Sequence, residues 1–136
     1  MDITFPVMAL QTQLHRQLMK GLEESGLSTG QPKVLAYLKS NEGESQKELA
    51  QACLLEPSSV TVLLQRMEKQ GLIERRQREG DRKTRSIFLT ECGHTLSALA
   101  VERFYEVERL AFEGVSEEEA AVFSRVCEKM LENLRS

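Results

Sequence analysis

Residues 46–76 decide the fold, and they read QKELAQACLLEPSSVTVLLQRMEKQGLIERR. The first seven residues indicate a short helix. Pro57 opens a second helix, because proline at the first helical position loses no hydrogen bond. Gly71 ends that helix, since glycine readily adopts the left-handed conformation that follows a helix. Two short helices separated by a tight turn predict a helix-turn-helix.

A β-hairpin is predicted directly after these helices. Residues 72–76 and 85–89 are the two predicted strands, and Glu79, Gly80 and Asp81 lie in the turn between them. An isolated hairpin is marginally stable, so it must pack against the helices. The expected fold is mainly α with a small β-hairpin wing, a winged helix-turn-helix that places one helix in a DNA major groove.

The helix from residue 57 has two distinct faces. Its apolar side chains recur at steps of three and four residues and form the predicted core face: Val60, Leu63, Leu64 and Met67. The opposite face carries short polar side chains near the N-terminus of the helix. Short side chains allow the helix to approach phosphates and bases closely. Together with charged residues of the hairpin it supplies the predicted DNA-binding residues: Ser58, Ser59, Thr61, Val62, Gln65, Arg66, Lys69, Arg75, Asp81, Arg82, Lys83 and Arg85.

Charge is distributed unevenly along the chain. The net charge is −3, yet residues 66–85 hold eight cations and four anions. Residues 102–132 show the opposite balance, with nine glutamates and four cations. The basic segment is therefore expected to face DNA phosphates, and the acidic segment is expected to lie on a surface that does not contact DNA.

The segments on both sides of residues 28–90 are predicted to be helical. A helix at residues 5–24 carries leucines four residues apart (Leu10, Leu14, Leu18, Leu22) and stops at Gly26. Thr90 caps a long helix that closes near Gly114, and a last helix carries Phe123, Val126, Cys127, Met130, Leu131 and Leu134. We expect residues 1–26 and 91–136 to form a helical dimerisation region around a DNA-binding region at residues 28–90, within one domain of residues 1–136.

Three pairs have the spacing of a capping box, in which a serine caps a helix and a polar residue three positions later bonds back. They are Ser28 with Gln31, Ser45 with Glu48, and Ser116 with Glu119. The first is expected to open a helix with Val34, Leu35 and Leu38 on its buried face, ending at residues 41–43. The second is expected to open a helix that turns Leu49, Ala50 and Cys53 inward.

Composition narrows the remaining possibilities. With 136 residues and 40% apolar content, the chain suits one globular domain. It shows neither a membrane-spanning run nor a signal peptide at its start, so a cytoplasmic protein is expected. No phosphate loop, nucleophile elbow or metal motif occurs, so neither an enzyme, a cofactor nor a metal site is predicted. The three cysteines (Cys53, Cys92, Cys127) are widely spaced, which argues against a disulfide framework.

The chain resembles the MarR family of bacterial transcriptional regulators. The matching segments are residues 27–35, Leu49-Ala50, residues 58–61, residues 67–73, and the hairpin from Gly80-Asp81-Arg82-Lys83 through residues 87–90 with Gly93 after it. They cover almost the whole chain in the family's order. The hairpin phrase combined with Gly71-Leu72-Ile73 is the most specific of them.

The resemblance implies a triangular, obligate homodimer whose first, fifth and sixth helices intertwine. It implies that each protomer places its fourth helix in a major groove of a palindromic operator and its wing in the adjacent minor groove. Ser59, Thr61, Val62 and Gln65 match groove-facing positions of the family, and Asp81 with Arg82 matches the wing motif. Lys83 replaces a common arginine, which keeps the charge but loses the planar fork.

The resemblance also implies repression that ends when a small, often aromatic and anionic, effector or an oxidant acts. Leu14, Tyr37 and Phe104 are candidates for lining an effector site. Cys92, just inside a helix N-terminus, is the redox candidate, because that position lowers a thiol pKa. A different class of function also stays open, namely a winged-helix module that binds an acidic protein partner.

Overall fold

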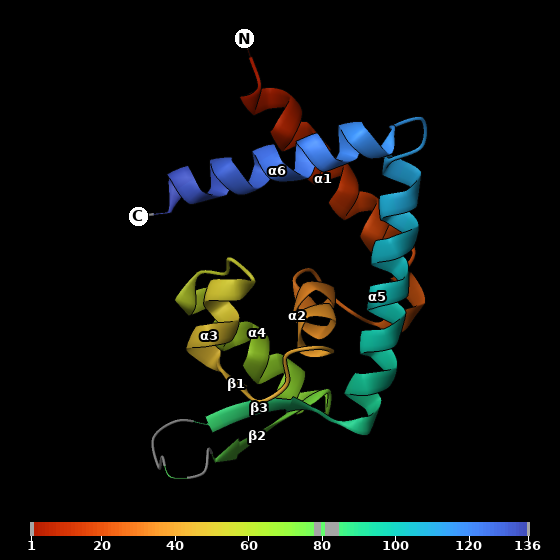
Figure 1. Ribbon diagram of the computed structural model, residues 1–136. Helices are drawn as coiled ribbons and strands as arrows, with labels where there is room; N and C mark the ends of the chain where they lie inside the picture. Colours follow the sequence, from red (N-terminus) through yellow and green to blue (C-terminus); the bar gives the residue numbers. More distant parts are fainter. Residues whose placement is uncertain (1, 78–79, 81–84, 136) are drawn as a thin grey trace.

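The computed structural model describes residues 2–77, 80 and 85–135, and within them it is mostly helical with one small sheet. The mainly α winged helix-turn-helix architecture is confirmed (Figure 1). The elements in chain order are α1 (Thr4–Lys20), the 3-10 helix η1 (Glu23–Ser25), α2 (Gln31–Leu38), β1 (Glu44–Ser45), α3 (Gln46–Ala52), α4 (Pro57–Lys69), β2 (Ile73–Gln77), β3 (Arg85–Leu89), α5 (Glu91–Ala111) and α6 (Glu117–Leu134).

Helix α5 runs along one side of the molecule and connects its two ends (Figure 1). At one end the sheet lies beneath α2, α3 and α4. At the other end α1 and α6 cross in this view, away from the sheet. Arg103 of α5 fastens α1 to this frame, because its guanidinium donates to the Gln17 carbonyl at 3.1 Å and to Glu106 at 2.9 Å.

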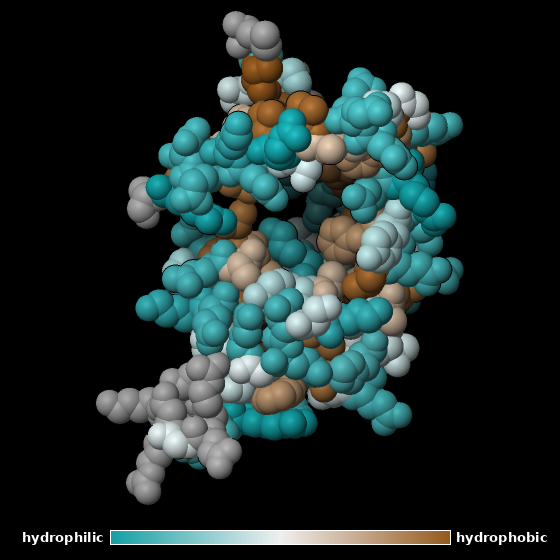
Figure 2. Space-filling model, viewed as in Figure 1, coloured by the Kyte–Doolittle hydropathy of each residue, from teal (hydrophilic) through white to brown (hydrophobic). Residues whose placement is uncertain are grey.

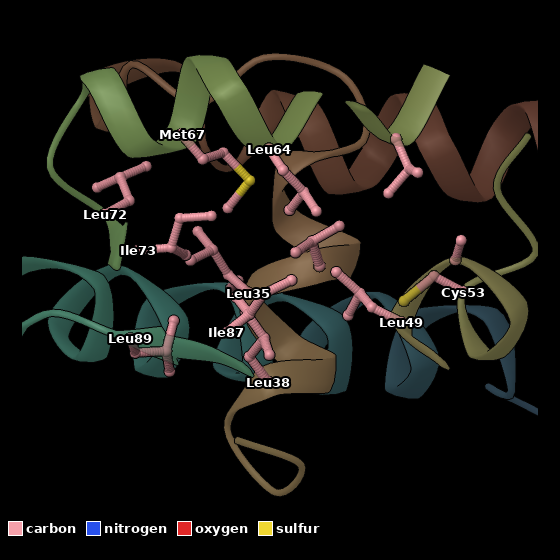
Figure 3. Close-up of a cluster of buried hydrophobic side chains, with 14 of the residues drawn as sticks. Leu35, Leu38, Leu49, Cys53, Leu64, Met67, Leu72, Ile73, Ile87 and Leu89 are labelled. Carbon is pink, nitrogen blue, oxygen red and sulfur yellow. The ribbon is translucent and has the colours of Figure 1, made fainter. Parts of the chain in front are cut away.

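The main hydrophobic core joins α2, α3, α4 and the sheet (Figure 3). It includes the inward faces expected from the sequence, with Leu63 only partly buried at its edge. Its fully or almost fully buried side chains include Val34, Leu35, Leu38, Leu49, Cys53, Val60, Leu64, Met67, Ile73 and Ile87. Helices of seven, eight and 13 residues are too short to be stable alone, so this shared core holds them in place.

The start of α2 differs from the expected capping box. Gly30, not Ser28, is the N-cap residue, and α2 begins at Gln31. Half of the box does form, since the Ser28 amide donates to Gln31 Oε1 at 3.0 Å. The Ser28 hydroxyl, however, is buried without a hydrogen-bond partner among the described residues. The boxes at Ser45 and Ser116 form completely, with each serine hydroxyl accepting from the amide three residues on.

Two other helix boundaries were predicted wrongly. The first helix ends at Lys20 instead of Glu24, and η1 carries the chain to Gly26, whose φ of +78° makes it the left-handed stop. The second helix ends at Leu38, before residues 41–43. Gly43 then turns the chain into β1, a two-residue strand that pairs antiparallel with β3. The short length of β1 concealed it in the sequence, and the sheet order is β1-β3-β2.

The junction between the sheet and α5 is very tightly packed. Thr90 caps α5 as predicted, because its hydroxyl accepts from the Gly93 amide at 3.0 Å and also donates to the Gly71 carbonyl at 2.6 Å. A β-carbon on Gly93 would lie 1.9 Å from the Leu72 carbonyl oxygen. One turn further, the buried Ser97 hydroxyl donates to the Leu35 carbonyl at 2.6 Å. These contacts fix the angle at which α5 leaves the DNA-binding region predicted at residues 28–90.

Replacing Gly93 with alanine is expected to destabilise the fold by about 1–3 kcal/mol, because the new methyl group meets backbone instead of a movable side chain. The gain in helix propensity, about 1 kcal/mol, opposes this loss without cancelling it. Urea denaturation followed by circular dichroism measures the change. Gly26→Ala is the matched control: nothing lies within 4 Å of its β-carbon. It should cost only the left-handed backbone strain, about 1 kcal/mol. A Gly93→Ala variant that is as stable as the wild-type protein would contradict the packing described.

Candidate nucleic-acid interface

The outward face of α4 carries the residues predicted for DNA contact. Its buried stripe of Val60, Leu64 and Met67 faces the core. The predicted α4 residues lie on the other faces and are all exposed: Ser58, Ser59, Thr61, Val62, Gln65, Arg66 and Lys69. No side chain caps the N-terminus of α4, since Glu56 makes no capping bond. Its first amides therefore remain available to an anion.

A polar clamp fixes α4 against its neighbours; we use this name for Gln46, Thr61, Glu68 and Arg75. Gln46 Nε2 donates to the Thr61 hydroxyl at 2.8 Å, and Arg75 donates to Gln46 Oε1 at 2.9 Å. Arg75 also lies 3.6 Å from the Glu68 carboxylate. The clamp connects α3, α4 and β2. The sequence did not reveal Gln46, because residues 29 positions apart in the chain show no pattern that would pair them.

Two of the predicted site residues already make contacts within the protein through this clamp. The Thr61 hydroxyl already donates to the Pro57 carbonyl at 3.1 Å and accepts from Gln46. The Arg75 side chain is only 16% exposed and is held by two partners. Both residues therefore orient α4 and β2, whereas Gln65, Arg66 and Lys69 form no hydrogen bond or ion pair with another described side chain.

A shallow hollow lies on the outer surface of α4. Its volume is about 400 Å³, and it is lined by Ser58, Ser59, Val62, Leu63 and Arg66. Val62 is 58% exposed there. The hollow thus combines an apolar wall with two hydroxyls and one guanidinium.

The two longer strands extend this surface away from the helices (Figure 1). Arg85 is exposed at the start of β3, opposite Gln77. The Arg76 guanidinium lies 4.2 Å from the centre of the Phe88 ring and pairs with Glu74 at 2.5 Å. The predicted tip residues Asp81, Arg82 and Lys83 lie outside the described residues.

A second, larger cavity lies between the two ends of the molecule. Its volume is about 910 Å³, and residues of α1, the start of α2, the end of α5 and the start of α6 line it. The space-filling view shows a hollow in this region (Figure 2). Leu14 and Phe104 line the cavity as proposed from the sequence, but Tyr37 does not. Most other lining side chains are apolar, with Lys33, His15, Glu108 and Glu119 among the polar ones.

Comparison with known proteins identifies the family of this arrangement. A model of the MarR family matches residues 25–84. PecS, a transcriptional regulator of Dickeya dadantii, is 33% identical over a 129-residue alignment that covers 90% of this chain and 77% of PecS. The chain belongs to the MarR family of transcriptional regulators.

Two further relatives extend the comparison. MdtR, a transcriptional repressor of Bacillus subtilis, is 30% identical over 92 residues, or 68% of this MarR-family chain. That match spans only 59% of MdtR, less than two thirds of its length. Among solved structures, MepR of S. aureus in a complex with DNA superposes with a TM-score of 0.90 at 25% identity, and the match covers 99% of both chains.

The cavity of this MarR-family chain reaches the turn before α4. Lys33, which lines it, donates to the Cys53 carbonyl at 2.8 Å and so holds the turn between α3 and α4. The neighbouring Gln31 is fully buried and donates to Gln70, the C-cap residue of α4, at 2.8 Å. Leu55, in the turn before α4, also lines the cavity. Lys33 and Leu55 thus lie both at the cavity and at the turn that leads into α4.

The helices at the chain ends leave large apolar side chains uncovered in a single protomer. On α1 these are Phe5, Val7, Met8, Leu10 and Leu14, and on α6 they are Val122, Phe123, Val126, Met130, Leu131 and Leu134, all at least 36% exposed. Clusters of this size normally mark an interaction surface. We refer to these residues, apart from Leu10, Leu14 and Phe123 that also line the cavity, as the terminal apolar surface.

The remaining chemical groups show few special features. Cys53 is buried, and burial raises the pKa of its thiol. Cys92 is exposed in the first turn of α5, and Cys127 is half-buried. Redox sensing through Cys92 stays a prediction. Within residues 2–77, 80 and 85–135 no metal-binding group of three suitable side chains occurs. No helix in the same part of the chain is long and apolar enough to cross a membrane.

Tyr37 fastens α2 to β1 instead of facing the cavity. Its hydroxyl lies 2.9 and 2.7 Å from the two Glu44 carboxylate oxygens, and this hydrogen bond raises the pKa of Tyr37 to about 12. Because the folded pKa exceeds the ordinary value of 10, the contact contributes its full stability below pH 10. That contribution is lost as the pH rises from about 10 to 12.

The stability of the protein is therefore expected to fall more steeply between pH 10 and 12 than that of a Tyr37→Phe variant, which lacks the titrating hydroxyl. Urea titrations at several pH values measure both slopes. Tyr105→Phe, at a tyrosine that is 63% exposed, is the control and should keep the wild-type slope. Identical slopes for the Tyr37→Phe and wild-type proteins would show that the Glu44 contact does not contribute.

Proposed function

We propose that this chain is a homodimeric, sequence-specific DNA-binding regulator that represses transcription and leaves its operator when a small molecule binds. The observation that carries the proposal is the exposed polar face of α4, held rigidly beside a hairpin whose sequence is basic. The likeness to MepR over almost the whole chain supports it, because that protein is in a complex with DNA. A helix with this face fits a major groove, and a basic hairpin beside it suits the adjacent minor groove.

The twelve residues predicted for DNA contact have two kinds of role in this proposal. Ser58, Ser59, Val62, Gln65 and Arg66 approach the bases and nearby phosphates. Lys69, Arg82, Lys83 and Arg85 attract phosphates or the narrow minor groove, and Asp81 orders the hairpin turn. Thr61 and Arg75 set the position of α4 through the polar clamp. The partner is double-stranded DNA with a palindromic site, since a two-fold dimer presents two equivalent helices.

Dimerisation would use the terminal apolar surface, from residues 1–26 and 91–136. Two copies that cover this surface remove many apolar side chains from water, which is the main driving force for association. The acidic charge of residues 102–132 suits this arrangement, because it keeps the dimerisation end away from phosphates.

The effector would occupy the 910 Å³ cavity, whose size and apolar lining suit a small organic molecule. Lys33 provides the route to α4, because a ligand that accepts a hydrogen bond from its ammonium group competes with the Cys53 carbonyl. The turn before α4 is then released, while the buried Gln31–Gln70 contact keeps the other end in place. The resulting tilt of α4 lowers the affinity of the dimer for its operator.

Operator binding should be strongly salt-dependent, and Arg82→Ala should weaken it. Each protomer loses one cation in this variant. The slope of log affinity against log salt concentration is therefore expected to become less steep by roughly 1 for each half-site. Fluorescence anisotropy with promoter fragments measures both effects. Arg135→Ala, at an exposed residue paired with Glu132, is the control and should bind as the wild type does. If the chain were instead a protein-interaction module, it would bind no duplex with a steep salt dependence. Arg82→Ala would then leave its affinity for DNA unchanged.

Introducing a charge into the terminal apolar surface should break the dimer. Val126→Glu places a carboxylate on the exposed apolar face of α6. Sedimentation velocity should then show monomers, and operator affinity should fall by a factor of roughly 100 or more, because two linked half-sites bind far more tightly than one. Leu54→Asn, at a 71% exposed residue between α3 and α4, is the control and should remain dimeric. A wild-type protein that is monomeric at micromolar concentration would contradict the proposed dimer.

A further inference from the structure

Val62 has no evident role in the fold of the protomer. It lies in the middle of α4 with 58% of its surface exposed, so it gains little from burial. A β-branched residue is also a poorer helix former than most, because its side chain loses rotational freedom against the preceding turn. An exposed position in a helix that needs only solubility would suit glutamate, lysine or glutamine better.

The surroundings of Val62 give it a defined shape. It is a wall of the 400 Å³ hollow, beside Leu63, with Ser58 and Arg66 one helical turn away on either side. The polar clamp lies along the next ridge of α4, where the Thr61 hydroxyl is already occupied by Pro57 and Gln46. The centre of the outward face is therefore apolar, and the groups around it can bond to phosphates or base edges.

In the major groove the exposed apolar group is the C5-methyl of thymine. Uracil lacks only this methyl, and cytosine presents an amino donor in place of the thymine carbonyl. A valine side chain in a shallow hollow contacts such a methyl without losing any hydrogen bond of its own. The hydroxyl of Ser58 and the guanidinium of Arg66 lie on either side of Val62, where each can bind a phosphate of the DNA backbone.

We propose that Val62 is a specificity-determining residue that selects thymine, through its C5-methyl, at one position in each half-site of the operator. This inference rests on the proposed function, since it names the base that one residue of α4 reads. Burial of about one methyl group against Val62 corresponds to a preference of roughly fourfold for thymine over uracil in each half-site.

The test starts with selection of bound duplexes from a random library by the purified wild-type protein. The library contains no methylated cytosine, so a methyl preference found in it belongs to thymine. Each thymine of the selected operator is then replaced by uracil, one symmetric pair at a time. The expected result is one pair whose replacement weakens wild-type binding by about sixteenfold, fourfold for each half-site. The Val62→Ala variant should lose most of this discrimination.

Gln65→Ala is the matched control, because it changes a polar residue of the same face and leaves the Val62 contact in place. It should keep the wild-type ratio of thymine to uracil affinity, whatever its absolute affinity. Val62→Thr keeps one methyl group and should retain part of the preference. Unchanged affinity with every uracil replacement, or undiminished discrimination by Val62→Ala, would overturn the inference and leave the proposed function standing. A wild-type protein that selects no sequence at all would overturn the proposed function itself.

Discussion

The burial of one stripe of α4 is the constraint on which the rest of the structure depends. Val60, Leu64 and Met67 are each at most 1% exposed, and they pack against α2, α3 and the sheet. Truncating Leu64 or Met67 to alanine costs about 2–5 kcal/mol, because buried apolar surface and dense packing are lost. Since a helix has only one orientation that buries such a stripe, the same contacts decide which side chains of α4 face outward.

Polar contacts then determine the tilt of α4 within that orientation. Gln46 and Arg75 hold its outer edge, Lys33 holds the turn before it, and Gln31 holds its last residue. A hydrophobic stripe alone allows small rotations and shifts, because dispersion and the hydrophobic effect have little directionality. Hydrogen bonds add direction. A buried partner left unpaired costs about 1–3 kcal/mol, so the network favours one position of the helix.

The two ends of the molecule differ in how completely they are packed. The helices and sheet around α4 form a closed core within one protomer, whereas α1 and α6 leave apolar side chains uncovered. The 910 Å³ cavity lies between these two parts, and α5 connects them. A site between a rigid unit and an incompletely packed one is a favourable place for control, because occupancy can change the relation between them without breaking either core.

The sequence by itself was sufficient for the local features. Helical spacing placed the buried stripe of α4, Gly71 marked the end of that helix, and the boxes at Ser45 and Ser116 formed as predicted. These features depend on residues at most four positions apart, whose geometry the backbone dictates. The roles of the tip residues Asp81, Arg82 and Lys83 are inferred from the sequence alone.

Only the tertiary structure decided features that join distant segments. It moved the N-cap of α2 to Gly30, added β1 beside β3, and turned Tyr37 toward Glu44 and away from the cavity. It also brought Gln46 to Arg75 and Gln31 to Gln70, 29 and 39 residues apart in the chain. Such pairs have no sequence period to reveal them, because they form only after the hydrophobic core has brought the helices together.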